Sequence, residues 1–274
     1  MRLTLGMALL ALAAGGVRAE PSLERGTYLV EGPMACGNCH TPFGEAGLDM
    51  TRALAGRVVE QNDRFTAIAP NITPGGRVAD WSDEELARAI REGIRPGDAI
   101  IGPPMPMELY HDLSDDDVMS VVLYLRRVPA VENDPGQSVY AMPRPAAYGP
   151  PVASNPGVPQ GATVEYGAYI AGPLAHCLAC HTPLGPDGPL YDTKLGAGGV
   201  LFEMPDGSVV RSVNITPTRI GDTSDEELDR MIRTGVKPDG HHLAPVMPFW
   251  GYAGMTEDDM AALILYLRAL PPRF

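Results

Sequence analysis

Apolar residues recur at helical spacing in segments near the start and end of each half of the chain. Apolar stretches predict short helices over residues 23–30 and 164–171. The positions Val118, Val121, Val122 and Leu125 lie on one face of a later helix, and a matching pattern follows in the second half. Each half is therefore predicted to begin and end with a helix that buries one face.

Polar residues mark where further helices start and stop. Ser82 with Glu85, and Ser224 with Glu227, have the spacing of capping boxes and predict middle helices that end at Gly93 and Gly235. The last helices are predicted to start in the same way, at Ser114 with Asp117 and at Thr256 with Asp259. The segments between them are rich in Gly and Pro and give few strand signals, so we expect an all-α fold.

The two halves repeat each other at an offset of 141 to 143 residues. The matched segments are "GTYLV" with "GAYIA", "NITP" with "NITP", "WSDEELARAIREGI" with "TSDEELDRMIRTGV", and "VVLYLRRVP" with "LILYLRALP". We predict a first unit over residues 20–131 and a second unit over residues 161–274. Between them, residues 132–160 form a proline-rich linker, expected to run along the surface in extended backbone.

The N-terminal segment, residues 1–19, has an early arginine, an apolar run and small residues before Glu20. This pattern predicts a cleaved export signal; a retained membrane anchor is the alternative, although the apolar run is shorter than the roughly 20 residues that span a bilayer. Export would place the protein in the periplasm of a Gram-negative bacterium. The net charge of −13 argues against nucleic acid as a partner and favours a basic docking face on another protein, or serves solubility alone.

All four cysteines of the chain lie in two Cys-x-x-Cys-His motifs, at matching places in the two units. Residues three apart on a helical turn face the same way, so both thiols can bond to one edge of a haem while the adjacent histidine lies over the iron. We therefore predict two haem c groups. Cys36 and Cys39 would attach the first and Cys177 and Cys180 the second, with His40 and His181 as proximal ligands.

Other uses of these cysteines fit less well. A zinc site would need thiols and histidines that converge, whereas each pair here has its own histidine. A dithiol redox pair would be expected after a strand, and these follow helices.

The distal iron ligands are predicted from the repeated Met-Pro pairs, which lie just before each last helix. Met105 and Met247 are the candidates, because His/Met ligation raises the reduction potential of a haem. Met107 is an alternative in the first unit. His111 and His242 could instead make bis-histidine haems, but neither repeats; His176 and His241 are expected at the surface or in packing.

Two further repeated features have open roles. Asn71 and Asn214, in "NITP", are expected either to hydrogen-bond near a haem or simply to form turns. Tyr28 with Tyr124, and Tyr169 with Tyr266, are expected to mark the packing of the first helix against the last.

The succession "GTYLV…CGNCHTP…NITP…WSDEELARAIREGI…MP…VVLYLRRVP", present twice, resembles the class I c-type cytochrome domain. In particular, it is similar to the cytochrome c subunits of alcohol, gluconate and related dehydrogenases. The resemblance implies two small helical domains, each folded around one haem.

We expect from this an electron-transfer protein, with dehydrogenase donors and oxidase or cytochrome acceptors, rather than an enzyme. The alternatives are a dihaem enzyme with one open haem, resembling a peroxidase or a sulfur-oxidising enzyme, and a redox or gas sensor. Methionine in both units argues against an open site, and the chain has no spare cysteine for the sulfur chemistry.

Overall fold

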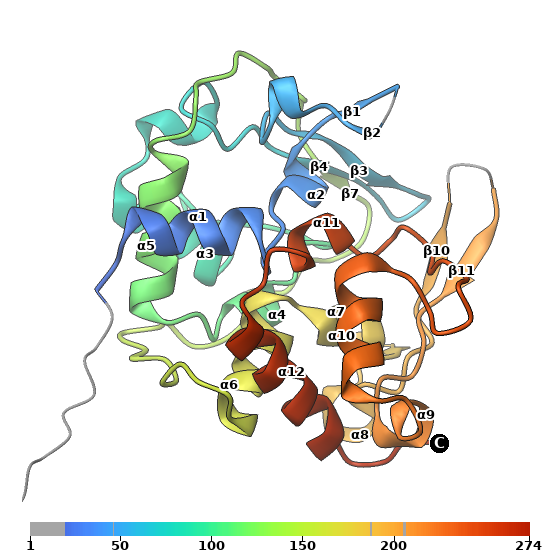
Figure 1. The fold of residues 1–274 in the computed structure, drawn as a ribbon. Helices are drawn as coiled ribbons and strands as arrows, with labels where there is room; N and C mark the ends of the chain where they lie inside the picture. Colours follow the sequence, from blue (N-terminus) through green and yellow to red (C-terminus); the bar gives the residue numbers. More distant parts are fainter. Residues whose placement is uncertain (1–19, 46, 187, 205–206) are drawn as a thin grey trace, which may run out of the picture.

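The first and last helices of each unit cross and pack on each other, as the apolar pattern predicts. The computed structural model describes residues 20–45, 47–186, 188–204 and 207–274. In the first unit, α1 (Leu23–Glu31) crosses α5 (Asp115–Leu125), and in the second, α6 (Val164–Tyr169) crosses α12 (Glu257–Ala269) (Figure 1). The predicted export signal, residues 1–19, lies outside the described residues.

A glycine makes each of these crossings possible. A Cβ atom added to Gly26 of α1 would lie 2.0 Å from the carbonyl oxygen of Ser120 in α5. At the equivalent Gly167 of α6 it would lie 1.9 Å from the carbonyl oxygen of Ala262 in α12. The helix backbones are therefore closer than any larger residue allows.

The middle helices form where their capping boxes predict. Helix α3 (Asp83–Arg91) begins after Ser82 and α10 (Asp225–Thr234) after Ser224, each with both reciprocal hydrogen bonds to the glutamate three residues on. Gly93 and Gly235, just beyond the helices, have φ values of 69° and 70°. Glycine adopts this left-handed backbone at low cost, so both helices end there.

The prediction of an all-α fold is wrong, because the described residues also contain several small antiparallel sheets. The largest joins β3 (Arg57–Gln61), β4 (Phe65–Ala69) and β7 (Val139–Tyr140). A second hairpin pairs β10 (Leu201–Glu203) with β11 (Val209–Arg211). The remaining strands are the two-residue hairpins β1 (Phe43–Gly44) with β2 (Gly47–Leu48), β5 (Ile94–Arg95) with β6 (Ala99–Ile100), and β8 (Leu184–Gly185) with β9 (Gly188–Pro189).

The strands are hard to see in the sequence for a physical reason. The pairing of β3 with β4 shifts register between Val58 and Glu60, which interrupts the two-residue alternation of a regular strand. Most β3 side chains are exposed, so burial does not select apolar residues there. The turn depends instead on Asn62, whose side-chain oxygen accepts the N–H groups of Arg64 and Phe65.

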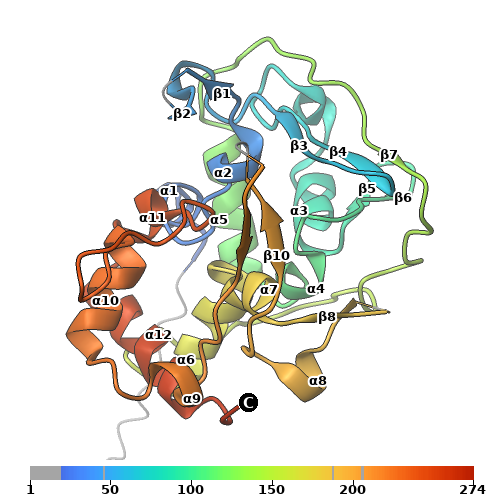
Figure 2. The same ribbon diagram turned by 90° about the vertical axis from the view of Figure 1, so that its right-hand side faces the viewer.

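The proline-rich linker lies against the first unit, and one part of it joins a sheet. Figure 2 shows it passing from α5 through β7 along the outside of the first unit. The hydroxyls of Tyr140 and Tyr148 donate to the carbonyls of Pro103 and Ile101, and the Asn155 amide donates to the carbonyl of Asp112. The linker is thus fixed along a surface path by side-chain hydrogen bonds.

The remaining helices are short and connect these elements. They are α2 (Gly37–His40), 3₁₀ turns at Met50–Arg52 and Arg77–Asp80, α4 (Met107–Tyr110), a π-turn at Ile170–Leu174, α7 (Cys177–His181), α8 (Tyr191–Lys194), α9 (Pro217–Ile220) and α11 (Phe249–Tyr252). Within the described ranges, no helix is both long and apolar enough to cross a membrane.

Candidate haem-binding sites

Both Cys-x-x-Cys-His motifs lie on a short helix that follows the first helix of its unit after a sharp turn. The turn is made by Ala35 before α2 and by His176 before α7, with φ values of 44° and 38°. A left-handed backbone costs a non-glycine residue about 1 kcal/mol or more. Both units have the same unfavourable conformation at the same place, so the chain makes the same sharp turn into each motif helix.

None of the four cysteines forms a disulfide, and burial dominates the surroundings of all four. Burial raises the pKa of Cys36 and of Cys177 to about 12. Burial, with a smaller contribution from the charge of Cys39, also raises the pKa of Cys180 to about 11. Reactive dithiol pairs have lowered thiol pKa values instead. Across the described residues, no three His, Cys, Asp or Glu side chains converge as a metal cluster, so the zinc alternative gains no support.

The two motif histidines are held in the orientation that an iron ligand needs. Nδ1 of His40 lies 2.8 Å from the carbonyl oxygen of Pro70, and Nδ1 of His181 lies 2.7 Å from that of Val213. A carbonyl can only accept, so Nδ1 carries the proton and Nε2 has its lone pair free for a metal. Burial lowers the pKa of both imidazoles and favours this neutral form.

Matching backbone contacts anchor both histidines. The carbonyl oxygen of His40 accepts the N–H of Gly56, and that of His181 accepts the N–H of Gly198. The next residue, threonine in each unit, is fully buried, and its hydroxyl accepts an N–H from Leu54 or Gly196. The repeat therefore preserves the setting of the histidine as well as its sequence.

In the second unit, three of the predicted haem contacts line one apolar cavity. Cys177, His181 and Met247 share its wall. The other lining residues are mostly aliphatic: Ala175, Ile215, Ile232, Tyr252, Leu263 and Leu267. A thioether, an imidazole and a cysteine around an apolar space suit the face of a porphyrin.

Cationic side chains suit the carboxylates at the edge of a haem. Among the described residues, the buried Nε atoms of four arginines have no hydrogen-bond partner: Arg57, Arg91, Arg95 and Arg273. Burial lowers the pKa of Arg95, and the positive charges of Arg77 and Arg144 lower it further. Such a group would be stabilised by an anion. The motif residues and the apolar lining of the second-unit cavity therefore fit a haem.

The structure separates the two methionines of the first unit. Met105 is partly buried, whereas Met107 is fully buried and its Cε would contact a Cβ added to Gly93 at 3.2 Å. In the second unit, Phe249 occupies the position of Met107 and packs in the same way on Gly235. Because phenylalanine cannot bind iron, this position serves packing in the second unit.

The histidines considered as distal ligands lie elsewhere. Nε2 of His111 is 2.9 Å from the carbonyl oxygen of Pro150 in the linker, and His241 and His242 are exposed. His176 is half-buried, with Nε2 3.2 Å from the carbonyl oxygen of Met34 and its ring edge-on to Tyr110. It packs between the two units.

Asn71 and Asn214 form turns and also fix the chain after the last helix. In both, the side-chain oxygen accepts the N–H and hydroxyl of the threonine two residues on. The amide of Asn71 donates to the carbonyl of Val131, and that of Asn214 to the carbonyl of Arg273. Each asparagine directly follows the residue whose carbonyl oxygen accepts the hydrogen bond of the motif histidine. The turn therefore helps to fix the position of that carbonyl.

The tyrosine pairs meet the expectation in part. The Cβ atoms of Tyr124 and Tyr266, on the last helices, lie beside Gly26 and Gly167 of the first helices. The hydroxyl of Tyr124 donates to Glu31 within the first unit, but the hydroxyls of Tyr28 and Tyr169 reach across to the other unit. Sequence reasoning also missed Tyr110 and Tyr252, both buried near the cysteines of their own units. Their shared place in the repeat, five residues after the Met-Pro methionine, was the available signal.

Comparison with known proteins relates the first unit to a family. Residues 21–125 match the model described as "Cytochrome C oxidase, cbb3-type, subunit III". The chain is 27% identical over 300 residues to the fructose dehydrogenase cytochrome subunit of Gluconobacter japonicus, covering 96% of this chain and 58% of that protein.

Two shorter matches agree. A diheme cytochrome c-type protein of Cereibacter sphaeroides is 40% identical over 115 residues, which is 41% of this chain and 37% of that protein. The cytochrome c subunit of the quinone alcohol dehydrogenase of Gluconacetobacter polyoxogenes is 41% identical over 108 residues, 38% of this chain and 21% of that protein. The chain thus spans between about a fifth and three fifths of these relatives.

The family that residues 21–125 match implies covalently bound haem c, which the Cys-x-x-Cys-His motif and its surroundings fit. Residues 21–125 therefore match the c-type cytochrome family described as cbb3-type subunit III, and the chain is similar to the cytochrome subunits of dehydrogenases.

Proposed function

We propose that this chain is a dihaem c-type cytochrome that passes single electrons from a donor dehydrogenase or respiratory component to a downstream acceptor. The observation that carries the proposal is the repeated site. In each unit, Nδ1 of the motif histidine donates a hydrogen bond to a backbone carbonyl, which leaves the lone pair of Nε2 available to bind iron. The names of the relatives support it, since they include a diheme cytochrome and cytochrome subunits of dehydrogenases.

Each unit would hold one haem through its own residues. Cys36 and Cys39 would form the thioether bonds in the first unit, and Cys177 and Cys180 in the second. Haem iron supplies a one-electron carrier, and the protein sets its potential through the axial ligands. We assign His40 and Met105 as ligands in the first unit, and His181 and Met247 in the second. Residues 20–131 and 161–274 would be the two domains, joined by the linker 132–160.

The net charge and the predicted export signal suggest a docking partner and a compartment. A chain with a net charge of −13 would meet a basic docking face on its partner, because opposite potentials speed encounter. The predicted signal at residues 1–19 would direct the protein to the periplasm. There, a dehydrogenase like those of the relatives would be the donor, and an oxidase or another cytochrome the acceptor.

The test is spectroscopy of the purified, matured protein. The ferric form is expected to show a sulfur-to-iron charge-transfer band with the intensity of two haems, and the ferrous form is expected not to bind carbon monoxide. Carbon monoxide binding by one haem would contradict paired His/Met ligation and favour a dihaem enzyme with one open site.

The first-unit ligand can be assigned with two matched variants. Met105→Leu is expected to remove half of the charge-transfer band, because the thioether on the iron is lost. Met107→Leu keeps the band, because this side chain fills the core as Phe249 does in the second unit. Loss of the band in Met107→Leu, with Met105→Leu unchanged, would reverse the assignment.

A further inference from the structure

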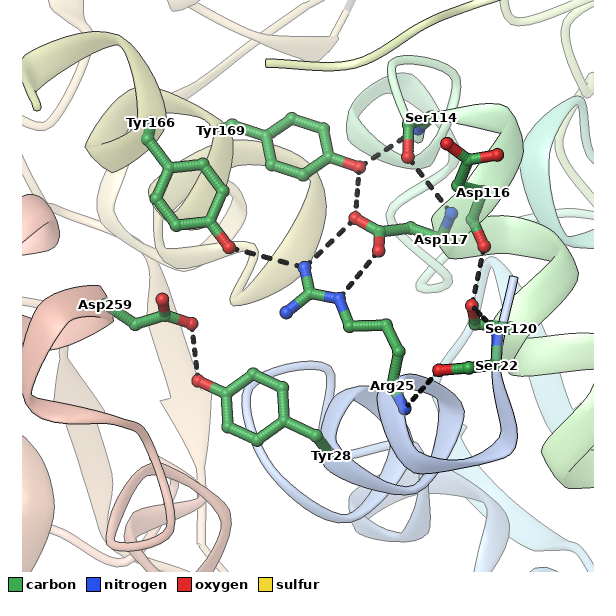
Figure 3. Close-up of polar contacts among 10 residues, drawn as sticks. All are labelled: Ser22, Arg25, Tyr28, Ser114, Asp116, Asp117, Ser120, Tyr166, Tyr169 and Asp259. Carbon is green, nitrogen blue, oxygen red and sulfur yellow. Dashed lines mark hydrogen bonds and ion pairs between the residues drawn. The ribbon is translucent and has the colours of Figure 1, made fainter. Parts of the chain in front are cut away.

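Two tyrosines clasp the units to each other in a reciprocal arrangement. The hydroxyl of Tyr28, on α1, donates to Asp259 Oδ2 at 2.5 Å and accepts the N–H of Thr256 at 3.3 Å. The hydroxyl of Tyr169, on α6, donates to Asp117 Oδ2 at 2.8 Å and accepts the N–H of Ser114 at 3.0 Å (Figure 3). Each tyrosine thus binds the first turn of the last helix of the other unit.

The partners are equivalent positions of the repeat. Tyr28 corresponds to Tyr169, and Asp259 to Asp117. On the approximate two-fold axis, Arg25 meets its own equivalent, Tyr166, with 3.3 Å between the guanidinium and the hydroxyl (Figure 3). An isologous dimer has this pattern, in which one surface binds its own copy.

An ion pair within the first unit holds the carboxylate that Tyr169 binds. Arg25 donates to both carboxylate oxygens of Asp117, at 2.7 and 3.2 Å, with 15% and 9% of the two side chains exposed. A bidentate pair of this kind is geometrically restrictive. The pair lies within the first unit, between α1 and α5, and it holds in place the carboxylate that Tyr169 of the second unit binds.

The clasp brings the two cysteine motifs together. Nε2 of His176, directly before the second motif, lies 3.2 Å from the carbonyl oxygen of Met34, two residues before Cys36, and its ring lies edge-on to Tyr110 of the first unit. A Cβ added to Gly37, inside the first motif, would lie 3.5 Å from the ring of Trp250 in the second unit. A Cβ added to Gly251 would lie 2.6 Å from the carbonyl oxygen of Gly32 in the other unit, so the backbones nearly touch.

We propose that the reciprocal tyrosine clasp, Tyr28 with Asp259 and Tyr169 with Asp117, positions the two cysteine motifs edge to edge, so that single electrons pass between the units across this contact. The inference rests on the proposed dihaem function. The transfer takes one electron from the reduced unit to the oxidised one and changes no covalent bond or proton. Its rate depends steeply on distance, so the clasp residues act by positioning.

The test compares the double variant Tyr28→Phe/Tyr169→Phe with the control Tyr124→Phe, whose hydroxyl bonds to Glu31 inside one unit. Two readouts are measured on the haem-loaded protein: the bisignate Soret circular dichroism of coupled haems, and the intramolecular electron-transfer rate after a light pulse. The double variant is expected to lose the bisignate signal and to slow at least tenfold, while the absorption spectrum of each haem stays unchanged. The control is expected to match the parent.

An unchanged rate and dichroism in the double variant would overturn the inference. Should that variant fail to fold, the single variants Tyr28→Phe and Tyr169→Phe decide the matter, with partial losses expected in each and no loss overturning it. A parent protein with no haem absorption would instead refute the proposed function, so the two failures are distinguishable.

Discussion

Replacing Gly167 with alanine is expected to lower the free energy of unfolding by about 3 kcal/mol or more, the upper end of what overpacking costs in protein interiors. The added Cβ would lie 1.9 Å from the carbonyl oxygen of Ala262. That oxygen belongs to the backbone of α12, so only separation of α6 from α12 relieves the clash. Gly26→Ala is expected to do the same to α1 and α5.

The matched control is Gly172→Ala, in the π-turn that follows α6, where an added Cβ meets no atom within 4 Å. Thermal unfolding followed by circular dichroism compares the three variants. Gly167→Ala and Gly26→Ala are expected to melt well below the parent, and Gly172→Ala close to it. Equal melting temperatures for Gly167→Ala and Gly172→Ala would mean that the helices do not cross as described.

Replacing Met247 with alanine is expected to lower the reduction potential of one haem and to open its iron to carbon monoxide. The thioether stabilises ferrous iron, and axial ligands set haem potentials over a range of roughly 0.8 V. The expected fall is a sizeable part of that range. One haem's share of the sulfur-to-iron band is expected to vanish with it.

A redox titration with optical detection measures this effect. The control is Met260→Leu, in the core of α12 and 1% exposed, a swap of similar volume that is expected to cost less than about 1.5 kcal/mol and to leave both potentials unchanged. If the Met247→Ala protein kept both potentials and the full band, the second-unit ligand would be another residue.

The helices could be predicted from sequence because their signals are local. The capping residues Ser82 and Ser224 and the terminating Gly93 and Gly235 act within a few residues of their own positions. The predicted helix at residues 164–171 differs slightly, since α6 gives way to a π-turn at Ile170. Pro173 lies in that turn and lacks the N–H that would continue an α-helix.

The strands and the contact between units could not be predicted, because both depend on distant partners. Strand β7 exists only because the linker returns to β4, more than seventy residues earlier. The sequence around Tyr28 does not show whether its hydroxyl bonds within its own unit or, as in the structure, to Asp259 of the other unit. Cys177 and His181 could be predicted as candidates because the Cys-x-x-Cys-His spacing is a local signal in the sequence. The carbonyl of Val213, which accepts the hydrogen bond of His181, is 32 residues away and appears only in the structure.

Intact mass spectrometry of the matured protein, after extraction with acidified acetone, tests most directly whether each unit is built around a covalently attached haem. The account predicts a mass that exceeds the polypeptide by two haem groups, with the colour remaining in the protein fraction. A mass equal to that of the bare polypeptide, with the pigment in the solvent, would contradict it.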